Sequence, residues 1–156
     1  MGKYIGTKLI EAAPAYRCID TGKIFLKSNK SINSYGFDEG YKIKYPDGYE
    51  SWSLKDVFEK AYMKVIPNSN LKSDISISQD MVNNFIKETH VDTVGDKTTV
   101  VRALLKNGFE IVEASACVDK NNYDENIGAE ICINKIKDKI WFLLGFLLQT
   151  AKNGVK

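Results

Sequence analysis

Polar and apolar residues alternate with strand periodicity in the middle of the N-terminal half. Tyr41, Ile43 and Tyr45 alternate with lysines, and this period of two places the aromatic and aliphatic side chains on one face of a β-strand. The Pro-Asp-Gly sequence at 46–48 has the residues of a tight turn. We therefore expect the chain to return as a second strand over 49–52.

The other elements of the N-terminal half are predicted from local signals. A first strand is expected to end at Pro14, and the serine- and asparagine-rich stretch 28–36 is expected to be a loop. Ser53 stands where a side chain would cap a short helix, with Val57 and Phe58 on the inner face of that helix. These signals predict a small β-rich region with one short helix.

Helical periodicity opens the C-terminal half. Ser78 is the expected N-cap of a helix that runs to about Thr89, and Ile77 and Val82 are spaced for a hydrophobic staple. Val82 and Phe85 would share the inward face of this helix. A staple of this kind sets the angle at which the chain enters the helix.

A β-hairpin is the sharpest local signal in this half. Asn107-Gly108 separates two runs rich in strand-forming residues, and this dipeptide favours a two-residue type I′ turn because both positions adopt positive φ. A two-residue loop would place Arg102 directly opposite Glu113, and opposite charges across two strands stabilise such a register. The sequence therefore predicts this pairing.

A long helix is predicted from about Asn121 to Ala151, with Asp119 as its cap. Its apolar residues recur at spacings of three and four, which places them along one face. The expected inward row is Ala129, Ile133, Ile136, Ile140, Leu143 and Leu147. Toward its end the helix is apolar nearly all round, and one face in a small domain cannot bury all of these side chains. We therefore expect a homo-oligomer formed through this helix, or a contact with the N-terminal half.

A proline-, asparagine- and serine-rich stretch separates the two halves. Residues 65–77 lack an amphipathic period and are expected to link an N-terminal module, 1–64, to a C-terminal module, 78–156. The expected fold class is α+β. A small β-rich module with one short helix is followed by a helix, a β-hairpin and a long helix.

Charge and hydropathy narrow the classes of partner. The net charge is +2 with a pI near 8.3, below the value of about 9 that is typical of nucleic-acid-binding domains. Of 22 basic residues only Arg17 and Arg102 are arginines, and arginine is the residue suited to bidentate readout of guanine. The apolar run at 140–148 is much shorter than the roughly 20 residues of a membrane span. Neither specific DNA readout nor a membrane partner is expected.

Catalytic chemistry is not expected either. Cys117 would need a base such as His90, the only histidine, close to it in space; the alternative is a small side chain packed at a strand end. The three cysteines lack metal-ligand spacing, and no phosphate-binding or nucleophile motif occurs. We therefore expect no catalytic residue, metal or cofactor. The odd cysteine count and the absence of a signal-peptide pattern favour a reducing cytoplasm.

One cluster of aromatic residues could bind a ligand. Tyr45, Tyr49 and Trp52 are flanked by lysines, and aromatic rings beside lysines can stack a base and neutralise phosphate. Together with Arg102 these residues are the candidate ligand-binding site. The alternative is that the alternating aromatics form the inner face of a sheet.

The C-terminal half carries a series of short motifs. They are Leu-Lys-Asn-Gly-Phe at 105–109, Ser-Ala-Cys-Val-Asp at 115–119, Tyr-Asp at 123–124, Ile-Gly at 127–128, Lys-Ile-Trp at 139–141 and Gly-Phe-Leu-Leu at 145–148. With these motifs the segment resembles the small tailed-phage proteins named after gene product forty-nine of the N-four podophage. Two departures are Ala114, where the family usually has glutamate, and Lys120, where it usually has proline.

The N-terminal half is similar to a phage leader module that precedes domains like the second Thoeris anti-defence protein. The two resemblances imply a phage or prophage accessory protein in the host bacterial cytoplasm. By analogy with the leader module, the expected function is non-enzymatic counter-defence in which the protein sequesters a nucleotide immune signal. The alternatives are a protein-binding inhibitor of a host enzyme or defence complex and, ranked last, a cysteine-dependent enzyme acting through Cys117. The expected partner is therefore a small nucleotide ligand or a host protein.

Overall fold

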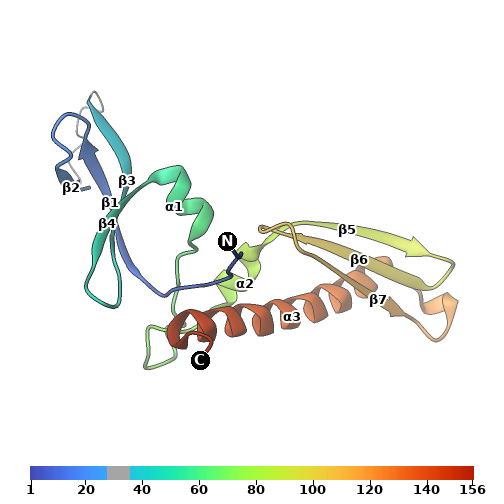
Figure 1. The fold of residues 1–156 in the computed structure, drawn as a ribbon. Coiled ribbons are helices and arrows are strands. Elements are labelled where there is room, and N and C mark those ends of the chain that lie inside the picture. The colour runs from blue at the N-terminus through green and yellow to red at the C-terminus, as the bar shows by residue number, and fades with distance from the viewer. Residues whose placement is uncertain (28–35) are drawn as a thin grey trace. The chain divides into compact units, whose positions relative to one another are not determined.

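The chain divides into two compact units, each described here by itself (Figure 1). A computed structural model describes residues 1–27 and 36–156. The first unit contains residues 1–64 and 150–156, and the second contains residues 65–149. Both units combine a β-sheet with helix, so the predicted α+β class is confirmed. The loop predicted at 28–36 lies outside the described residues except for its last residue.

The first unit is built on a four-stranded antiparallel sheet. Its elements are β1 (Glu11–Cys18), β2 (Ile24–Leu26), β3 (Phe37–Lys44), β4 (Glu50–Leu54) and α1 (Lys55–Ala61). The strand order is β2-β1-β3-β4. The strand periodicity around Ile43 and the turn at 46–48 are confirmed, because β3 and β4 form a hairpin closed by the Gly48 N–H and the Tyr45 carbonyl at 2.9 Å.

Pro14 does not end the first strand. It lies inside β1, directly opposite Tyr41 of β3. Its carbonyl accepts a hydrogen bond from the Lys27 N–H at 2.8 Å, just beyond the end of β2. The side of Pro14 that lacks an N–H therefore faces the place where the neighbouring strand has stopped. Because proline has no N–H to donate in return to Lys27, this pair keeps one of its two possible hydrogen bonds, and it lies at the end of the β2 ladder, where a strand tolerates proline.

The short helix α1 forms where expected but without the predicted cap. Its N-cap is Leu54 and no side chain caps it, because the Ser53 hydroxyl donates to the Leu54 carbonyl at 3.3 Å. Phe58 does face inward and stacks on Tyr41 with ring centroids 4.1 Å apart. Val57, predicted on the same face, is exposed. With no buried residue in α1, the helix is held mainly by aromatic contacts.

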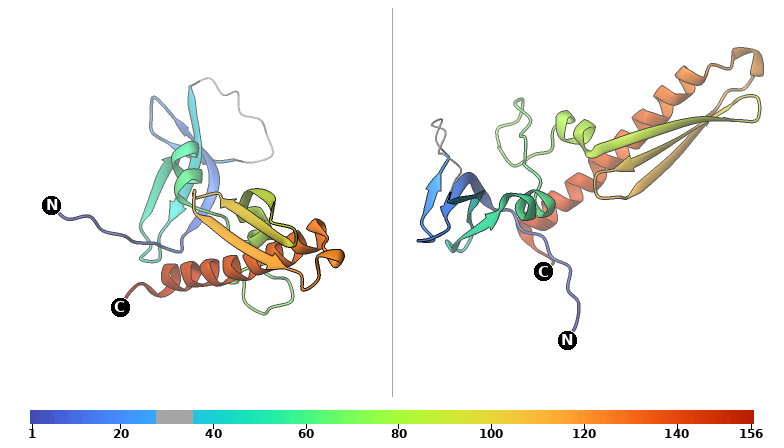
Figure 2. Two further views of the ribbon diagram at one scale, coloured as in Figure 1. Left: turned by 90° about the vertical axis from the view of Figure 1, so that its right-hand side faces the viewer. Right: turned by 90° about the horizontal axis from the view of Figure 1, so that it is seen from above.

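The second unit places a long helix against a three-stranded sheet (Figure 2). Its elements are α2 (Gln79–Phe85), β5 (Ile86–Val94), β6 (Thr98–Leu105), β7 (Glu110–Ala116), the 3-10 turn η1 (Lys120–Asn122) and α3 (Glu125–Asn153). The strand order is β5-β6-β7, all antiparallel. The third strand, β5, was not predicted by the sequence pattern.

The first helix of this unit is shorter than predicted. The Ser78 cap is confirmed, since its hydroxyl accepts from the Met81 N–H at 3.4 Å. The helix ends at Phe85, however, and the residues up to Thr89 belong to β5. In β5 the β-branched residues Thr89, Val91 and Thr93 alternate with His90 and Asp92, and pairing with β6 favours their extended conformation over another helical turn.

The hairpin between β6 and β7 has its turn at the predicted place but in another register. Gly108 has a φ of 83°, and no other residue type among the described residues has positive φ, so Asn107 does not adopt the type I′ conformation. The Gly108 N–H bonds to the Leu105 carbonyl at 2.9 Å, and the Leu105 N–H bonds to the Phe109 carbonyl at 2.8 Å. This is a three-residue loop with glycine in the left-handed position.

The longer loop shifts the strand pairing by one residue. Arg102 lies opposite Val112 rather than Glu113, and its guanidinium pairs with Glu110 at 2.9 Å. A shift of one residue moves side chains to the other face of the sheet. Glu113 accordingly lies on the face toward α3 and forms an ion pair with Lys139. The predicted Arg102–Glu113 pair is therefore wrong.

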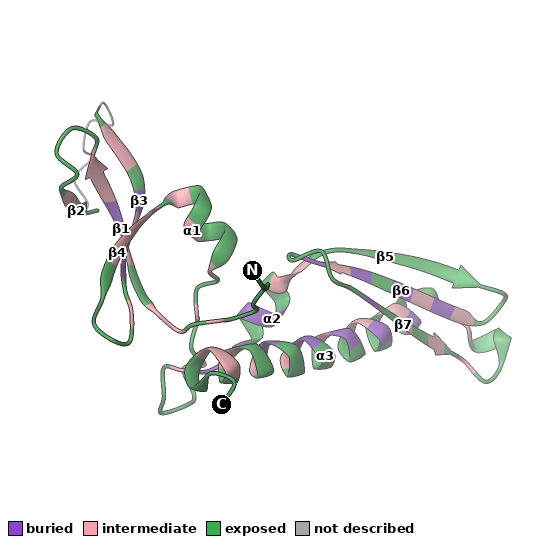
Figure 3. Cartoon of the chain, in the orientation of Figure 1, coloured by how far each residue is buried: buried purple, intermediate pink, exposed green. Residues whose placement is uncertain are grey.

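The core of the second unit lies between α3 and the sheet (Figure 3). The buried residues of α3 recur every four positions. They are Gly128, Cys132, Ile136, Ile140 and Leu144. Of the predicted inward row, Ile136 and Ile140 are among these buried residues. Leu143 and Leu147 are exposed, whereas Ala129 and Ile133 are partly buried at the edge of the core. A sheet presents a flat surface that one narrow line of the helix contacts, so the strict i, i+4 row is buried.

Two aspartates share the capping at the start of α3. Asp119 caps η1, accepting from the Asn121 N–H at 2.9 Å, and does not cap the long helix as predicted. Asp124 does so, because its Oδ1 accepts from the N–H groups of Asn126 and Ile127 at 2.8 and 3.1 Å. Side-chain oxygens at this position satisfy N–H groups that have no partner within the helix.

The segment predicted as a linker, 65–77, belongs to the second unit. Val65 and Ile77 pack against the core. The buried Ser76 hydroxyl accepts from the Asn68 N–H at 2.9 Å. Although it contains no helix or strand, this segment is attached to the second unit at both of its ends.

Candidate functional site

Two of the predicted ligand-binding residues, Tyr45 and Tyr49, lie together. They flank the turn between β3 and β4, where the Tyr45 N–H donates to the Tyr49 carbonyl at 2.9 Å. Their ring centroids are 5.8 Å apart, with 32° between the ring planes. This distance lies within the range in which aromatic rings attract one another. Tyr49 is 65% exposed, so a face of the pair is open to solvent.

The tyrosine pair extends into a longer aromatic row. Phe58 stacks between Tyr41 and Tyr62, with centroid distances of 4.1 and 4.9 Å. Burial, and then a side-chain hydrogen bond with Tyr45, raise the pKa of the Tyr62 phenol. We call Tyr41, Phe58, Tyr62, Tyr45 and Tyr49 the aromatic row. It covers the face of the first sheet that carries α1.

Polar groups border the aromatic row. The Lys8 ammonium lies 5.4 Å from the centroid of the Tyr45 ring, within the range of a cation–π interaction. At the opposite end the Tyr41 hydroxyl donates to Glu59 at 2.9 Å, and this bond raises the pKa of Tyr41. The row therefore has a cation at the Tyr45 end and a carboxylate at the Tyr41 end.

Trp52 lies on the other face of the same sheet. It is directly opposite Lys42 of β3, and Lys42 alternates with the tyrosines along that strand. The Arg17 guanidinium lies over the indole, 4.1 Å from the ring centroid, and pairs with Asp38 at 3.0 Å. Trp52 also packs so closely on Gly40 that a Cβ there would lie 2.7 Å from the indole. The tyrosines and Trp52 therefore do not form one surface.

Arg102 belongs to the second unit, whereas the aromatic residues belong to the first. It lies on β6, level with His90 on one side and Val112 on the other. Its ion pair with Glu110 is about half exposed on both partners, and such pairs contribute little to stability.

Cys117 follows the end of β7 and is not brought to a base. Its thiol donates to the Asp119 carbonyl at 3.1 Å. The strand register places His90 level with Val112, five residues before Cys117, a separation of roughly 15 Å along an extended strand. His90 instead lies 3.8 Å from Glu88. The arrangement matches a cysteine that packs at a strand exit.

The residues around Cys117 hold α3 to the sheet. The Tyr123 hydroxyl lies 2.7 Å from the Thr93 hydroxyl and 3.0 Å from that of Thr99. Gly128 lies against Thr99, where a Cβ would be 2.2 Å from the threonine hydroxyl. These contacts give structural roles to Tyr123 of the Tyr-Asp motif and to Gly128 of the Ile-Gly motif.

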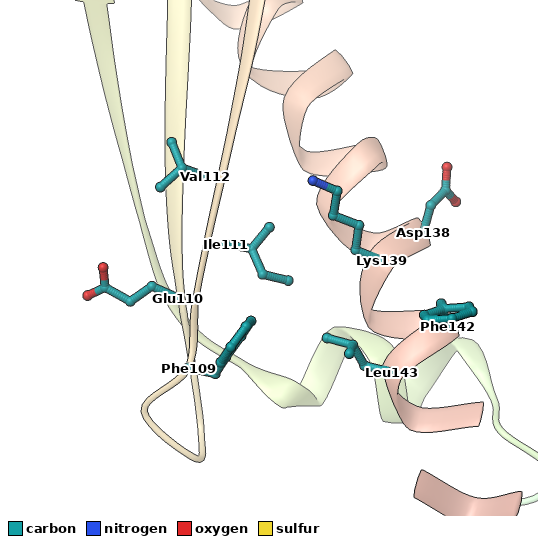
Figure 4. A pocket seen from close by; sticks show the side chains of 8 residues that line it. All are labelled: Phe109, Glu110, Ile111, Val112, Asp138, Lys139, Phe142 and Leu143. Carbon is teal, nitrogen blue, oxygen red and sulfur yellow. The ribbon is translucent and has the colours of Figure 1, made fainter. Parts of the chain in front are cut away.

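A groove lies between β7 and α3 of the second unit (Figure 4). Its volume is about 570 Å³. It is lined by Phe109, Glu110, Ile111, Val112, Asp138, Lys139, Phe142 and Leu143. Phe109 and Ile111 point from β7 toward Leu143 of α3, whereas Glu110 and Val112 point away from the helix. Sequence reasoning foresaw the apolar helix but not this groove, because the groove depends on the strand register.

Within residues 1–27 and 36–156, no group of three or more His, Cys, Asp or Glu side chains is placed to hold a metal ion. None of the described helices is long and apolar enough to cross a membrane.

Residues 77–152 match the family model described as Phage protein (N4 Gp49/phage Sf6 gene 66) family. The resemblance predicted for the C-terminal part is therefore confirmed, and the match supports a phage accessory protein. Comparisons with curated proteins and with solved structures gave no match. The similarity of the N-terminal half to a phage leader module stays a prediction.

Proposed function

We propose that this phage accessory protein, with its C-terminal part of the Gp49 type, binds a small ligand with a planar ring, and that the ligand is a nucleotide signal of host immunity. The observation that carries the proposal is the aromatic row on the first sheet. Its Tyr45–Tyr49 end is open to solvent and bordered by Lys8. A planar base stacks on such rings, and a lysine beside them attracts phosphate.

The proposed role is sequestration rather than catalysis. Stacking of a base on an aromatic ring contributes about 1–3 kcal/mol, and it requires no reacting group. Cys117 and His90 lie far apart along the sheet, which argues against a thiol–imidazole pair. A protein that holds the signal and releases it slowly would lower its free concentration during infection. Counter-defence is the expected consequence.

Thermal unfolding with a ligand panel tests this proposal. Cyclic dinucleotides and ADP-ribose derivatives are added to the purified chain at about 100 times the expected Kd, where a specific ligand stabilises the folded state by about 2.7 kcal/mol. Tyr49→Ala should weaken binding by about tenfold or more, because it removes a stacking surface. No stabilisation by any member of the panel would contradict the proposal.

Arg102→Ala is the matched control for the same measurement. Arg102 was part of the predicted site but lies in the other unit. Its replacement therefore distinguishes a site made of the aromatic row alone from the predicted site that also includes Arg102. If the aromatic row binds the ligand by itself, Arg102→Ala keeps wild-type affinity. Equal loss in Tyr49→Ala and Arg102→Ala would contradict a site made of the aromatic row alone.

A second candidate function is inhibition of a host enzyme or defence complex by direct protein contact. The groove between β7 and α3 favours it, because Phe109 and Phe142 are both exposed there. Affinity capture from phage-infected cells would compare the wild-type chain with Phe142→Ser. A host protein lost in the variant would then be purified and its binding measured directly. Equal capture by both chains would argue against the groove as the contact.

A further inference from the structure

Strand β7 presents an open edge beside the groove. The Leu105 N–H bonds to the Phe109 carbonyl and the Cys117 N–H bonds to the Lys97 carbonyl, so the odd-numbered residues of β7 direct their backbone groups toward β6. In an antiparallel ladder the alternate residues direct theirs the opposite way. The N–H and carbonyl groups of Glu110 and Val112 therefore face away from the sheet, at the edge that borders the groove.

The open edge is short because a lysine closes its far end. The Lys135 ammonium donates to the Ala114 carbonyl at 3.3 Å, and lysine at a strand edge is a common device against pairing. The stretch that can pair thus runs from Glu110 to Val112. An added strand of about three residues, at roughly 3.3 Å per residue, has the length of this stretch.

The side chains along this stretch determine which residues an added strand must have to pair with it. On the face toward α3, Ile111 and Phe109 border the apolar groove with Leu143 opposite them. On the other face lie Glu110, whose carboxylate is about half exposed, and Val112, which is exposed. The fitting strand has a large apolar residue at its centre, flanked by one cation and one aliphatic residue.

The N-terminal segment of this same chain has that pattern. Residues 1–6 contain no helix or strand. Tyr4 and Ile5 are 95% and 100% exposed, which is unusual for two large apolar side chains in succession. Lys3 precedes them. The tripeptide therefore presents a cation, an aromatic ring and an aliphatic side chain, in that order.

We propose that two copies of this chain associate by exchange of their N-terminal segments, Lys3-Tyr4-Ile5 of each copy adding as a strand to β7 of the other. In a parallel alignment Lys3 lies beside Glu110, Ile5 lies beside Val112, and Tyr4 enters the groove opposite Ile111. The reverse alignment would place Ile5 beside the Glu110 carboxylate and Lys3 beside Val112. The charge pattern therefore selects the parallel one.

This association explains two exposed apolar surfaces at once. The segment covers the β7 edge and the groove, and the groove covers Tyr4. Because the contact is reciprocal, a two-fold pair satisfies both copies and leaves no further open edge of this kind, which gives a closed dimer. The inference does not rest on the proposed ligand, since the aromatic row takes no part in it.

Sedimentation velocity over a hundredfold concentration range tests the dimer. The wild-type chain, 17.6 kDa as a monomer, should reach twice that mass and dissociate on dilution. Tyr4→Ser and Leu143→Ser should each weaken association by about tenfold or more, as expected for a central apolar contact. Val118→Ser, which also removes an exposed apolar side chain in the second unit, is the control and should leave association unchanged.

A photo-crosslinking residue at position 4 tests the occupant of the groove. Copies that carry it are mixed with isotopically heavy copies, and the joined peptides are sequenced by mass spectrometry. Links from position 4 to heavy peptides containing 109–112 or 139–143 support the exchange. Three results would each overturn the exchange: a monomer at every concentration, links only within one copy, or a dimer that Tyr4→Ser leaves intact. If a host protein occupies the groove instead, the purified chain should stay a monomer at every concentration.

Discussion

At the scale of single residues, Cys18 and Cys132 show how the environment gives identical side chains different properties. A side-chain hydrogen bond with Thr21, followed by a backbone hydrogen bond from the same residue, lowers the pKa of the Cys18 thiol. Burial raises the pKa of Cys132, which is completely enclosed in the core of the second unit. The thiolate is the nucleophilic form, so these two residues should differ in reactivity.

Alkylation with iodoacetamide near neutral pH should modify Cys18 well before Cys132. We expect a difference in rate of at least about tenfold, because Cys132 is both protonated and inaccessible until the unit unfolds. Time-resolved mass spectrometry of the labelled peptides measures both rates in one sample. Equal rates in the folded protein would contradict the burial of Cys132, and equal rates in urea provide the control.

The raised pKa of Tyr62 gives stability a pH dependence on the alkaline side. In the unfolded chain a tyrosine ionises near pH 10, whereas burial keeps the folded-state pKa of Tyr62 higher. The unfolded state therefore loses its proton first. The contribution of this residue to stability is present below about pH 10 and is lost as the pH rises through the folded-state pKa.

Tyr62→Phe should make stability fall less steeply with alkaline pH than in the wild-type chain. The phenylalanine of the variant cannot ionise, so the part of the stability loss above about pH 10 that comes from Tyr62 disappears. Urea unfolding at pH 8, 9.5 and 10.5 measures the slopes. A variant with the same slope as the wild type would show that Tyr62 titrates alike in both states.

At the scale of elements, the contact between α3 and β6 depends on one glycine. A Cβ at Gly128 would lie 2.2 Å from the Thr99 hydroxyl and 2.6 Å from the Thr99 Cβ, closer than atoms approach. The helix can therefore lie this near the strand only with glycine at the contact. Gly145 belongs to the same helix, but a Cβ there meets no atom within 4 Å.

Gly128→Ala should destabilise the second unit, whereas Gly145→Ala should stabilise it. The first change overpacks the helix–strand contact, at a cost of about 1–3 kcal/mol. The second gains about 0.5–1 kcal/mol from the better helix propensity of alanine. Urea unfolding followed by circular dichroism gives both values. Stabilisation by both substitutions would show that the helix can move away from Thr99 without loss.

The hairpin of β6 and β7 shows which features local sequence signals predict and which they do not. The Asn-Gly signal located the turn correctly, because glycine is needed for a positive φ. The register could not be read from that signal, since Asn-Gly fits both a two-residue and a three-residue loop. The difference of one residue was decided by tertiary packing, which places Val101, Ala103 and Ile111 against α3 and leaves Arg102 outside.

At the scale of the whole molecule, the proposed association links stability to concentration. Each unit is small, and small units bury a limited share of their apolar surface. Large side chains stay exposed in both units, including Tyr4 in the first and Phe142 in the second. A partner that binds only the folded state stabilises it by mass action.

The melting temperature of the wild-type chain should rise with its concentration. Over a hundredfold range we expect an increase on the order of 5 °C for a chain of this size. In Tyr4→Ser the melting temperature should be nearly independent of concentration. Differential scanning fluorimetry on a dilution series measures both. A concentration-independent wild type would mean that the folded chain gains nothing from a second copy.

The sequence predicted only part of the aromatic row. Tyr45 and Tyr49 flank a short turn, so their proximity follows from local chain geometry. Trp52 lies three residues further on, and strand alternation sends it to the other face. Phe58 and Tyr62 were missed as members of the row, because only the packing of α1 on the sheet brings them to Tyr41 and Tyr45.

Sequence by itself determined the local features of this protein. They include the β3–β4 hairpin, the Ser78 cap, the position of the Gly108 turn and the phage motifs of the C-terminal part, because each depends on residues close together in the chain. The tertiary structure alone decided the strand β5, the register of β7 and the groove beside it. Those features depend on which side chains meet across the core. Because the hydrophobic effect that drives this burial is non-directional, several arrangements of the strands and helices fit the same pattern of apolar residues. Side-chain packing selects one of them.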